Sequence, residues 1–179
     1  GTPLFWVVLL APLGMVFFLS ARLDSMRPST AAATFIAYAL TNGLAFSVLF
    51  ITYELGSIFQ VFLIAAGMYA AAAVYGFTTK RDLTNMGSFL FMGLIGLIIA
   101  SIVNVFLGSS ALEFAVSILG VGIFTGLTVY DMNRMKEQAI VMYAGEGLAQ
   151  KRAILGALSL YLNFVNLFLY LLRLFGERR

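Results

Sequence analysis

The sequence predicts an all-α polytopic membrane protein, and three observations lead to this prediction. Of the 179 residues, 61% are hydrophobic and 11% are charged, and the mean hydropathy is +0.98. Soluble domains are only about half apolar and about a quarter charged. The apolar residues come in blocks of about twenty, the length that lets a helix cross roughly 30 Å of hydrocarbon. The alternating segments of about ten residues that build membrane β-barrels are missing from the sequence, so we expect one transmembrane helical bundle over residues 1–179 without a second domain.

Six membrane-spanning segments follow one another along the chain, each bounded by polar residues. We expect them at about residues 3–19, 30–52, 58–76, 87–107, 111–142 and 153–175. Polar turns at residues 22–28, 54–57, 78–82 and 108–111 separate the first five. The longer polar stretch at 133–152 contains helix-forming residues up to Gln138, so the fifth helix is expected to continue to about Met142.

The basic residues predict how this bundle is oriented. The loops at residues 53–57 and 108–111 carry no Lys or Arg, and cytoplasmic loops are the ones enriched in these residues. On the opposite side, which we therefore expect in the cytoplasm, lie Arg22, Arg27, Lys80, Arg81, Arg134, Lys136, Lys151 and Arg152. Gly1 would then lie outside, so a further helix is expected before it. Because Arg178 and Arg179 oppose this rule, the last helix either crosses despite them, which we favour, or re-enters.

The composition also excludes several kinds of function. The chain has no cysteine and no histidine, which excludes disulfides, cysteine nucleophiles, histidine bases and the usual zinc or haem ligands. Neither a serine-hydrolase motif nor a paired-aspartate protease motif is present, so we expect no enzymatic activity and no cofactor. The net charge of +3 follows from the basic loops, so we expect no nucleic-acid partner.

Asp131 is the acidic residue that the predicted helices place inside the membrane. It follows the apolar run at 126–130, and the helix is expected to continue beyond it. An ionisable group inside the bilayer is costly, which makes it a candidate for function. Two antiparallel helices place residues equidistant from their connecting loop at similar depth. With Gly147 as the centre, Asp131 and Asn163 are each sixteen residues away, so we expect them to face each other.

A polar stripe follows one face of the last predicted helix. The spacing between its members is four, three, four and three residues, which places them on one side of a helix. The members are Ser159, Asn163, Asn166, Tyr170 and Arg173. Because polar groups are costly against lipid, this helix is expected at the centre of the bundle. The stripe either joins helices through hydrogen bonds or lines a permeation or sensing path.

Three motifs, in this order along the chain, resemble the Bax inhibitor family, the transmembrane Bax-inhibitor-motif proteins. They are TTKRDL at residues 78–83, GLTVYD at 126–131, and LSLYLNFVNLF at 158–168 followed by LLRLFG at 171–176. The resemblance extends over essentially the whole chain, and the last motif is the most specific. It implies six helices around a central seventh, of which the first would precede Gly1. It also implies a pH-sensitive calcium leak across the membrane.

The resemblance assigns candidate roles to several residues. In the family, two aspartates on the last two helices share protons; Asp131 matches the first, whereas the second position is Asn163. Arg22 is the nearest match to an arginine that latches the pair, although the surrounding turn matches poorly and a plain positive-inside residue is the alternative. Arg173 matches the final motif, and its alternative role is to reach the outer membrane surface.

The asparagine changes what the pair can do. Two close carboxylates titrate as a unit and together offer calcium hard oxygen ligands. An amide keeps one oxygen but has no charge, so we expect a single titration at Asp131 and a weaker attraction for calcium there.

Two functions from different classes remain open. The first is a pH-responsive calcium leak channel, weakened by Asn163, with calcium as the permeant ion. The second is a non-conducting regulator that binds a membrane protease or another membrane complex, which the asparagine favours. In both cases the protein is expected in a lipid bilayer, and its compact loops suggest a bacterial inner membrane.

Overall fold

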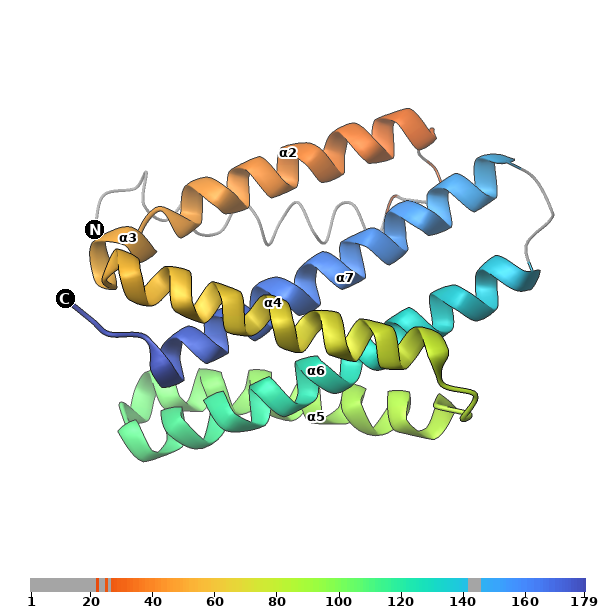
Figure 1. Cartoon of the computed structure of the whole chain (residues 1–179). Helices are drawn as coiled ribbons and strands as arrows, with labels where there is room; N and C mark the ends of the chain where they lie inside the picture. The colour runs from red at the N-terminus through yellow and green to blue at the C-terminus, as the bar shows by residue number, and fades with distance from the viewer. Residues whose placement is uncertain (1–21, 23–24, 26, 142–145) are drawn as a thin grey trace.

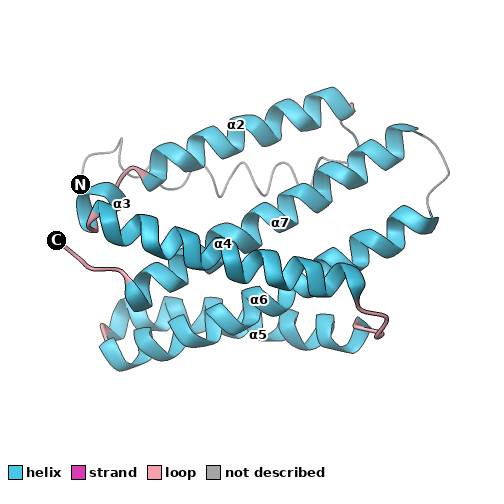
Figure 2. Cartoon of the chain, viewed as in Figure 1, coloured by secondary structure: helices cyan, strands magenta, loops and turns pink. Residues whose placement is uncertain are grey.

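The computed structural model describes residues 22, 25, 27–141 and 146–179. These residues form helices α2 (Pro28–Phe46), α3 (Leu49–Thr52), α4 (Leu55–Thr78), α5 (Thr84–Leu107), α6 (Ser110–Val141) and α7 (Glu146–Phe175). Figure 2 shows that short loops join the successive helices from α2 to α6 and that the described part of the chain contains no strand. The segment predicted at residues 3–19 lies outside the described residues. The helix count and the single domain over 1–179 therefore stay predictions.

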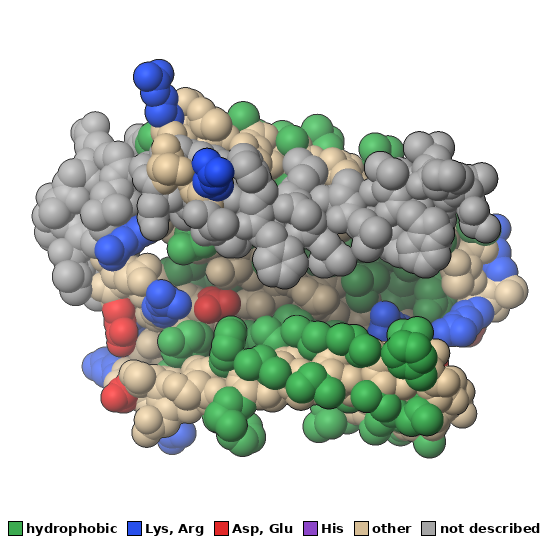
Figure 3. Space-filling view, turned by 180° about the vertical axis from the view of Figure 1, so that it is seen from behind, with side chains coloured by type: hydrophobic (Ala, Val, Ile, Leu, Met, Phe, Trp, Pro, Cys, Tyr) green, Lys and Arg blue, Asp and Glu red, His purple; other side chains and the backbone are tan. Residues whose placement is uncertain are grey.

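Five stretches of the described chain are long and apolar enough to cross a membrane. They are Pro28–Thr52, Leu55–Thr78, Thr84–Leu107, Ser110–Gln138 and Arg152–Phe175. Each overlaps one predicted segment, which confirms the all-helical polytopic class. Large apolar side chains point away from the bundle, as Phe106 and Val105 do with 85% and 81% of their surface exposed. Figure 3 shows such side chains along the outer face of α5. An outward apolar surface of this kind is suited to contact with lipid.

Two helix boundaries differ from the predictions. The segment predicted over 30–52 is divided between α2 and α3 at Ser47 and Val48. The Ser47 hydroxyl donates to the carbonyl of Leu44 at 2.7 Å, and this local bond tightens the backbone at that point. The membrane-spanning segment predicted from about residue 153 is found at Arg152–Phe175, but the helix that contains it begins earlier, at Glu146. Its additional residues include Glu, Leu, Ala, Gln, Lys and Arg, all good helix formers, so the helix extends beyond its apolar part.

The long helices run side by side, and their ends define two ends of the bundle (Figure 1). The basic end is the one where α4 and α6 end and where α5 and α7 begin. The tail end is the opposite one, where α4 and α6 begin and where the chain terminates after α7. Because α7 is one uninterrupted helix from the basic end to the tail end, the structure favours crossing over re-entry.

The centre of the described bundle is shared by two helices. The main neighbours of α7 are α2, α4 and α6, and those of α6 are α4, α5 and α7. Four leucines of α7 are at most 2% exposed: Leu158, Leu167, Leu171 and Leu172. The central place predicted for the last helix therefore agrees with its burial, but α6 is equally central among the described helices.

Candidate functional site

Asp131 on α6 and Asn163 on α7 are in direct contact. The Asn163 side-chain amide donates a hydrogen bond to the Asp131 carboxylate over 2.7 Å. Asn163 is buried, with 5% of its surface exposed, and Asp131 is half-buried. The expectation that these two residues face each other is confirmed.

The chemistry of this contact depends on the amide. An asparagine donates a hydrogen bond without any change of protonation, whereas a carboxylic acid donates only when it is protonated. The contact with Asn163 therefore needs no proton on the Asp131 carboxylate. The amide occupies the position that a protonated aspartic acid would otherwise fill.

A cavity of about 680 Å³ lies beside this contact, between α5, α6 and α7. Four members of the polar stripe line it, namely Ser159, Asn163, Asn166 and Tyr170. The opposite wall is largely apolar and includes Phe91 from α5. These four stripe residues thus face a cavity within the protein. This agrees with the prediction that their polar side chains avoid the lipid surface.

Two smaller cavities lie toward the ends of the bundle. A cavity of about 250 Å³ toward the basic end is lined by Asp131, Arg134 and Ser159, which also line the central cavity, and by Arg152. A cavity of about 290 Å³ toward the tail end is lined by the remaining stripe residue, Arg173, together with Glu113, Asn104 and Ser101. The five stripe residues therefore line cavities at three successive levels of the bundle.

The described part of the structure does not bring Arg22 to the pair. Arg22 is exposed, and the ion pair found among the described residues joins two other side chains. The latch role that the resemblance implies for Arg22 remains without a supporting contact.

Few acidic side chains lie near the pair among the described residues. Among the described residues, no three His, Cys, Asp or Glu side chains lie close enough together to hold a metal ion. Asp131 would offer calcium one carboxylate, whereas calcium in proteins takes six to eight oxygen ligands. The arrangement fits transient contact with a hydrated cation better than tight binding.

Two buried amides outside the predicted site also join helices. The side-chain amide of Asn133 on α6 donates to the carbonyl of Gly76 at 3.1 Å, and Asn133 is 4% exposed. Asn42 on α2, which is 7% exposed, donates to the hydroxyl of Tyr161 on α7 at 3.1 Å. The position of Asn42 within an apolar segment is a signal that sequence reasoning could have used, since polar groups in spans usually find partners. Asn133 begins the polar stretch of the sequence and gives no such signal.

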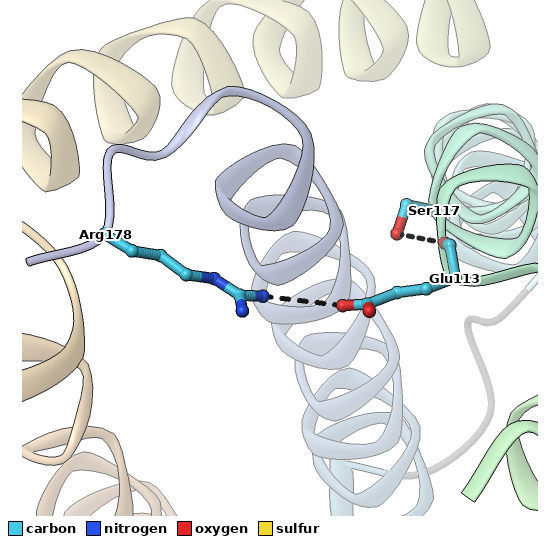
Figure 4. Close-up of polar contacts among 3 residues, drawn as sticks. All are labelled: Glu113, Ser117 and Arg178. Carbon is cyan, nitrogen blue, oxygen red and sulfur yellow. Dashed lines mark hydrogen bonds and ion pairs between the residues drawn. The ribbon is translucent and has the colours of Figure 1, made fainter. Parts of the chain in front are cut away.

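The C-terminal tail is held at the tail end of the bundle. The guanidinium of Arg178 lies 3.5 Å from the carboxylate of Glu113 at the start of α6, as Figure 4 shows. The backbone N–H of Glu177 donates to the Ser57 hydroxyl at 2.7 Å, and the N–H of Glu54 donates to the Glu177 carbonyl at 2.9 Å. Arg178 thus has an acidic partner at an end of the bundle where the orientation rule predicts no basic residues.

The sequence matches known proteins along almost its entire length. The family model described as "Inhibitor of apoptosis-promoting Bax1" matches residues 2–179. The chain is 45% identical over 175 residues to an uncharacterized protein of Borreliella burgdorferi, covering 98% of this chain and 75% of that protein. It is 44% identical over 173 residues to the inner membrane protein YbhL of Escherichia coli strain K12, covering 96% of this chain and 74% of YbhL.

These matches, together with the membrane-spanning helices, confirm an integral membrane protein of the bacterial inner-membrane type. The three motifs recognised in the sequence lie on the α4–α5 loop, on α6 and on α7, and all of them fall within the matched range. The chain belongs to the Bax inhibitor family.

Proposed function

We propose that this protein is a pH-responsive calcium leak of the Bax inhibitor type, in which calcium passes beside Asp131 and Asn163. One observation carries the proposal. The contact between the two residues lies where the basic-end cavity and the central cavity meet, because Asp131, Arg134 and Ser159 line both. A carboxylate at that junction attracts a cation entering from either side.

The polar stripe supplies the rest of the proposed path. Asn166 and Tyr170 continue the polar lining of the central cavity beyond the pair. At the next level Glu113 lines the tail-end cavity and gives a second carboxylate to the route. Arg173 lies in the same cavity, with its guanidinium 5.4 Å from the ring centre of Tyr170. A positive charge there opposes cation entry, which suits a slow leak better than a fast channel.

The proposed pH response depends on a single ionisable group at the junction. Protonation of Asp131 removes the carboxylate charge that attracts calcium, while the Asn163 amide remains a neutral donor. A single carboxyl group binds its proton in one step, whereas two close carboxylates titrate in two separate steps, one of which is shifted toward neutral pH. We therefore expect weak pH gating in this protein, with calcium as the permeant ion and no resident cofactor.

A second candidate function is a non-conducting regulator that binds a membrane protease or another membrane complex. The observation that favours it is again Asn163, since the amide removes the second carboxylate from the pair. Under this proposal the pair joins α6 to α7 and conducts nothing. Neither candidate involves enzymatic chemistry.

Calcium flux into proteoliposomes tests the first candidate. We expect Asp131→Asn to reduce the flux at least several-fold at neutral pH, because it removes the charge at the junction. Glu137→Gln is a matched control, since it makes the same acid-to-amide change on an exposed residue of α6. Equal flux through Asp131→Asn and the wild type would contradict the proposal. No flux through the wild type would favour the regulator.

A further inference from the structure

The central cavity and the tail-end cavity follow one another along the same three helices, α5, α6 and α7. On α5 the lining of the central cavity extends as far as Ile98, and the lining of the tail-end cavity begins at Ser101. On α7 the central cavity ends at Tyr170, and Arg173 lines the tail-end cavity. Among the residues that the structure describes, none lines both cavities. The two cavities are therefore separate, with about one helical turn of α5 and α7 between their linings.

On α6 the separation is wider, and a glycine lies within it. The central cavity ends at Phe124, the tail-end cavity begins at Val116, and Gly120 is four residues from each, on the same face of the helix. A Cβ atom added to Gly120 would lie 2.7–2.8 Å from three atoms of the Tyr170 ring. The ring therefore lies directly against the backbone of α6, at the level between the two cavities.

Two further contacts hold the Tyr170 ring in this position. The ring stacks on Phe124, with 5.7 Å between the ring centres and 24° between the ring planes. Phe124 is itself buried, so it gives the Tyr170 ring a fixed wall. The guanidinium of Arg173 lies 5.4 Å from the centre of the Tyr170 ring, where a cation is attracted to an aromatic face. The ring thus contacts one residue of the central cavity and one residue of the tail-end cavity.

We propose that the side chain of Tyr170 is a gate of the leak, and that it closes the passage between the central cavity and the tail-end cavity while its ring lies at Gly120. This inference rests on the proposed calcium leak and adds a second point of control to the one at Asp131. A hydrated cation cannot pass a packed aromatic ring, so passage requires the ring to turn away about its side-chain bonds. Glycine at position 120 allows the closed position, because a Cβ atom there would displace the ring.

Access of a water-soluble thiol reagent to the central cavity tests the gate without any measurement of ion flux. Because the sequence has no cysteine, Asn166→Cys places a single thiol in the lining of this cavity, one helical turn from Tyr170. The reagent is a membrane-impermeant cationic methanethiosulfonate, added on the tail-end side of the membrane, which is the outside of spheroplasts in the predicted orientation. We expect slow labelling while Tyr170 is present. Labelling should be at least about fivefold faster when Asn166→Cys is combined with Tyr170→Ala.

Three further variants, each combined with Asn166→Cys, separate a gate from a packing contact. Tyr170→Phe keeps the ring and loses only the hydroxyl, so its labelling rate should stay within about twofold of that with Tyr170. Gly120→Ala keeps Tyr170 but displaces its ring, so labelling should become faster, as it does in Tyr170→Ala. Phe168→Ala is the matched control. It removes a half-buried ring of α7 whose centre lies 6.0 Å from that of Phe62 on α4, away from the cavities, and should leave the labelling rate unchanged.

Two labelling results would overturn the gate. The first is an equal labelling rate with Tyr170 and with Tyr170→Ala. The second is an equal increase in Phe168→Ala, which would show a general loosening of α7. Thermal unfolding of each variant in the same detergent shows whether the substitution disturbs the fold.

Calcium flux through Tyr170→Ala in proteoliposomes separates the gate from the leak on which it rests. We expect this flux to exceed that of the wild type several-fold, because the barrier between the two cavities is removed. Faster labelling without any calcium flux would contradict the proposed leak and leave the barrier in place. Unchanged labelling together with calcium flux would contradict the gate and leave the leak in place.

Discussion

At the scale of the residue, the Asn163 amide sets the chemistry of the junction. It donates to Asp131 over 2.7 Å without needing a proton of its own. A carboxylate at position 163 could keep this hydrogen bond only if one of the two acids were protonated. Position 163 therefore determines whether the pair responds to pH as one group or as two.

Asn133 illustrates a residue whose role is structural. Its amide donates to the carbonyl of Gly76, one of the last carbonyls of α4, and the contact is buried. We expect Asn133→Ala to lower the free energy of unfolding by about 1–3 kcal/mol, because a buried acceptor loses its partner. Denaturant unfolding in micelles measures this loss, with the exposed Glu137→Ala as the control. A change no larger than that of the control would show that the contact contributes nothing.

Asp82 in the α4–α5 loop gives a prediction about pH. Its carboxylate accepts hydrogen bonds from the hydroxyl of Thr84 at 2.6 Å and from the N–H of Thr84 at 3.1 Å, and these bonds lower the pKa of Asp82. A pKa that is lower in the folded state adds stability above the ordinary pKa, and this stability is lost as the pH falls. We expect Thr84→Val to raise the pKa of Asp82 toward its ordinary value, as followed by NMR of the carboxyl carbon. An unchanged pKa would contradict the assignment.

At the scale of the element, the packing of α4 on α6 depends on one glycine. A Cβ atom added to Gly76 would lie in contact with the backbone carbonyl of Val129. By contrast, a Cβ added to Gly67 on the same helix would meet no atom within 4 Å. On one helix, therefore, Gly76 has no room for a larger side chain, whereas Gly67 does.

Substitution of these two glycines tests the close approach of the helices. We expect Gly76→Ala to lower the free energy of unfolding by about 1–3 kcal/mol, since the backbone of Val129 must move. Gly67→Ala should be neutral or stabilising by up to about 1 kcal/mol through its higher helix propensity. Thermal unfolding of both variants in the same detergent gives the comparison. Equal behaviour of the two variants would contradict the close packing of α4 against α6.

Sequence patterns predict the spans better than they predict how helices meet. Hydropathy and the spacing of the stripe correctly indicate the helices and the facing of Asp131 and Asn163, because both follow from helix period and depth. The break at Ser47 depends on one local hydrogen bond, which hydropathy does not register. The cavities and the contact at Gly76 depend on three-dimensional packing between distant segments. For this reason the sequence does not separate Gly76 from Gly67.

At the scale of the whole molecule, the two ends of the bundle differ in charge and in structure. The basic end carries most of the Lys and Arg residues, whereas the tail end joins the last residues of the chain to α3, α4 and α6. The paired Arg178 explains how a basic C-terminus is accommodated at that end. The charge bias predicts that the basic end lies in the cytoplasm.

The absence of cysteine allows a direct test of this orientation. A single introduced cysteine is the only thiol in this sequence. Its labelling by a membrane-impermeant maleimide therefore shows on which side of the membrane that residue lies. We expect the exposed Ser110→Cys at the tail end to be labelled from outside intact spheroplasts. Asn85→Cys at the basic end, also exposed, should be labelled only after the membrane is opened. The reverse pattern would contradict the predicted orientation.

Calcium flux in proteoliposomes that contain either the wild-type chain or Asn163→Asp is the decisive measurement for the role of the pair. Flux is compared at about pH 6 and about pH 8, on either side of the range in which a coupled acid pair is expected to change its proton count. We expect the flux through Asn163→Asp to change more between these two pH values than the flux through the wild type, because a second carboxylate beside Asp131 adds a titration step that is shifted toward neutral pH. Equal flux through the two proteins at both pH values would contradict the role assigned to Asp131 and Asn163.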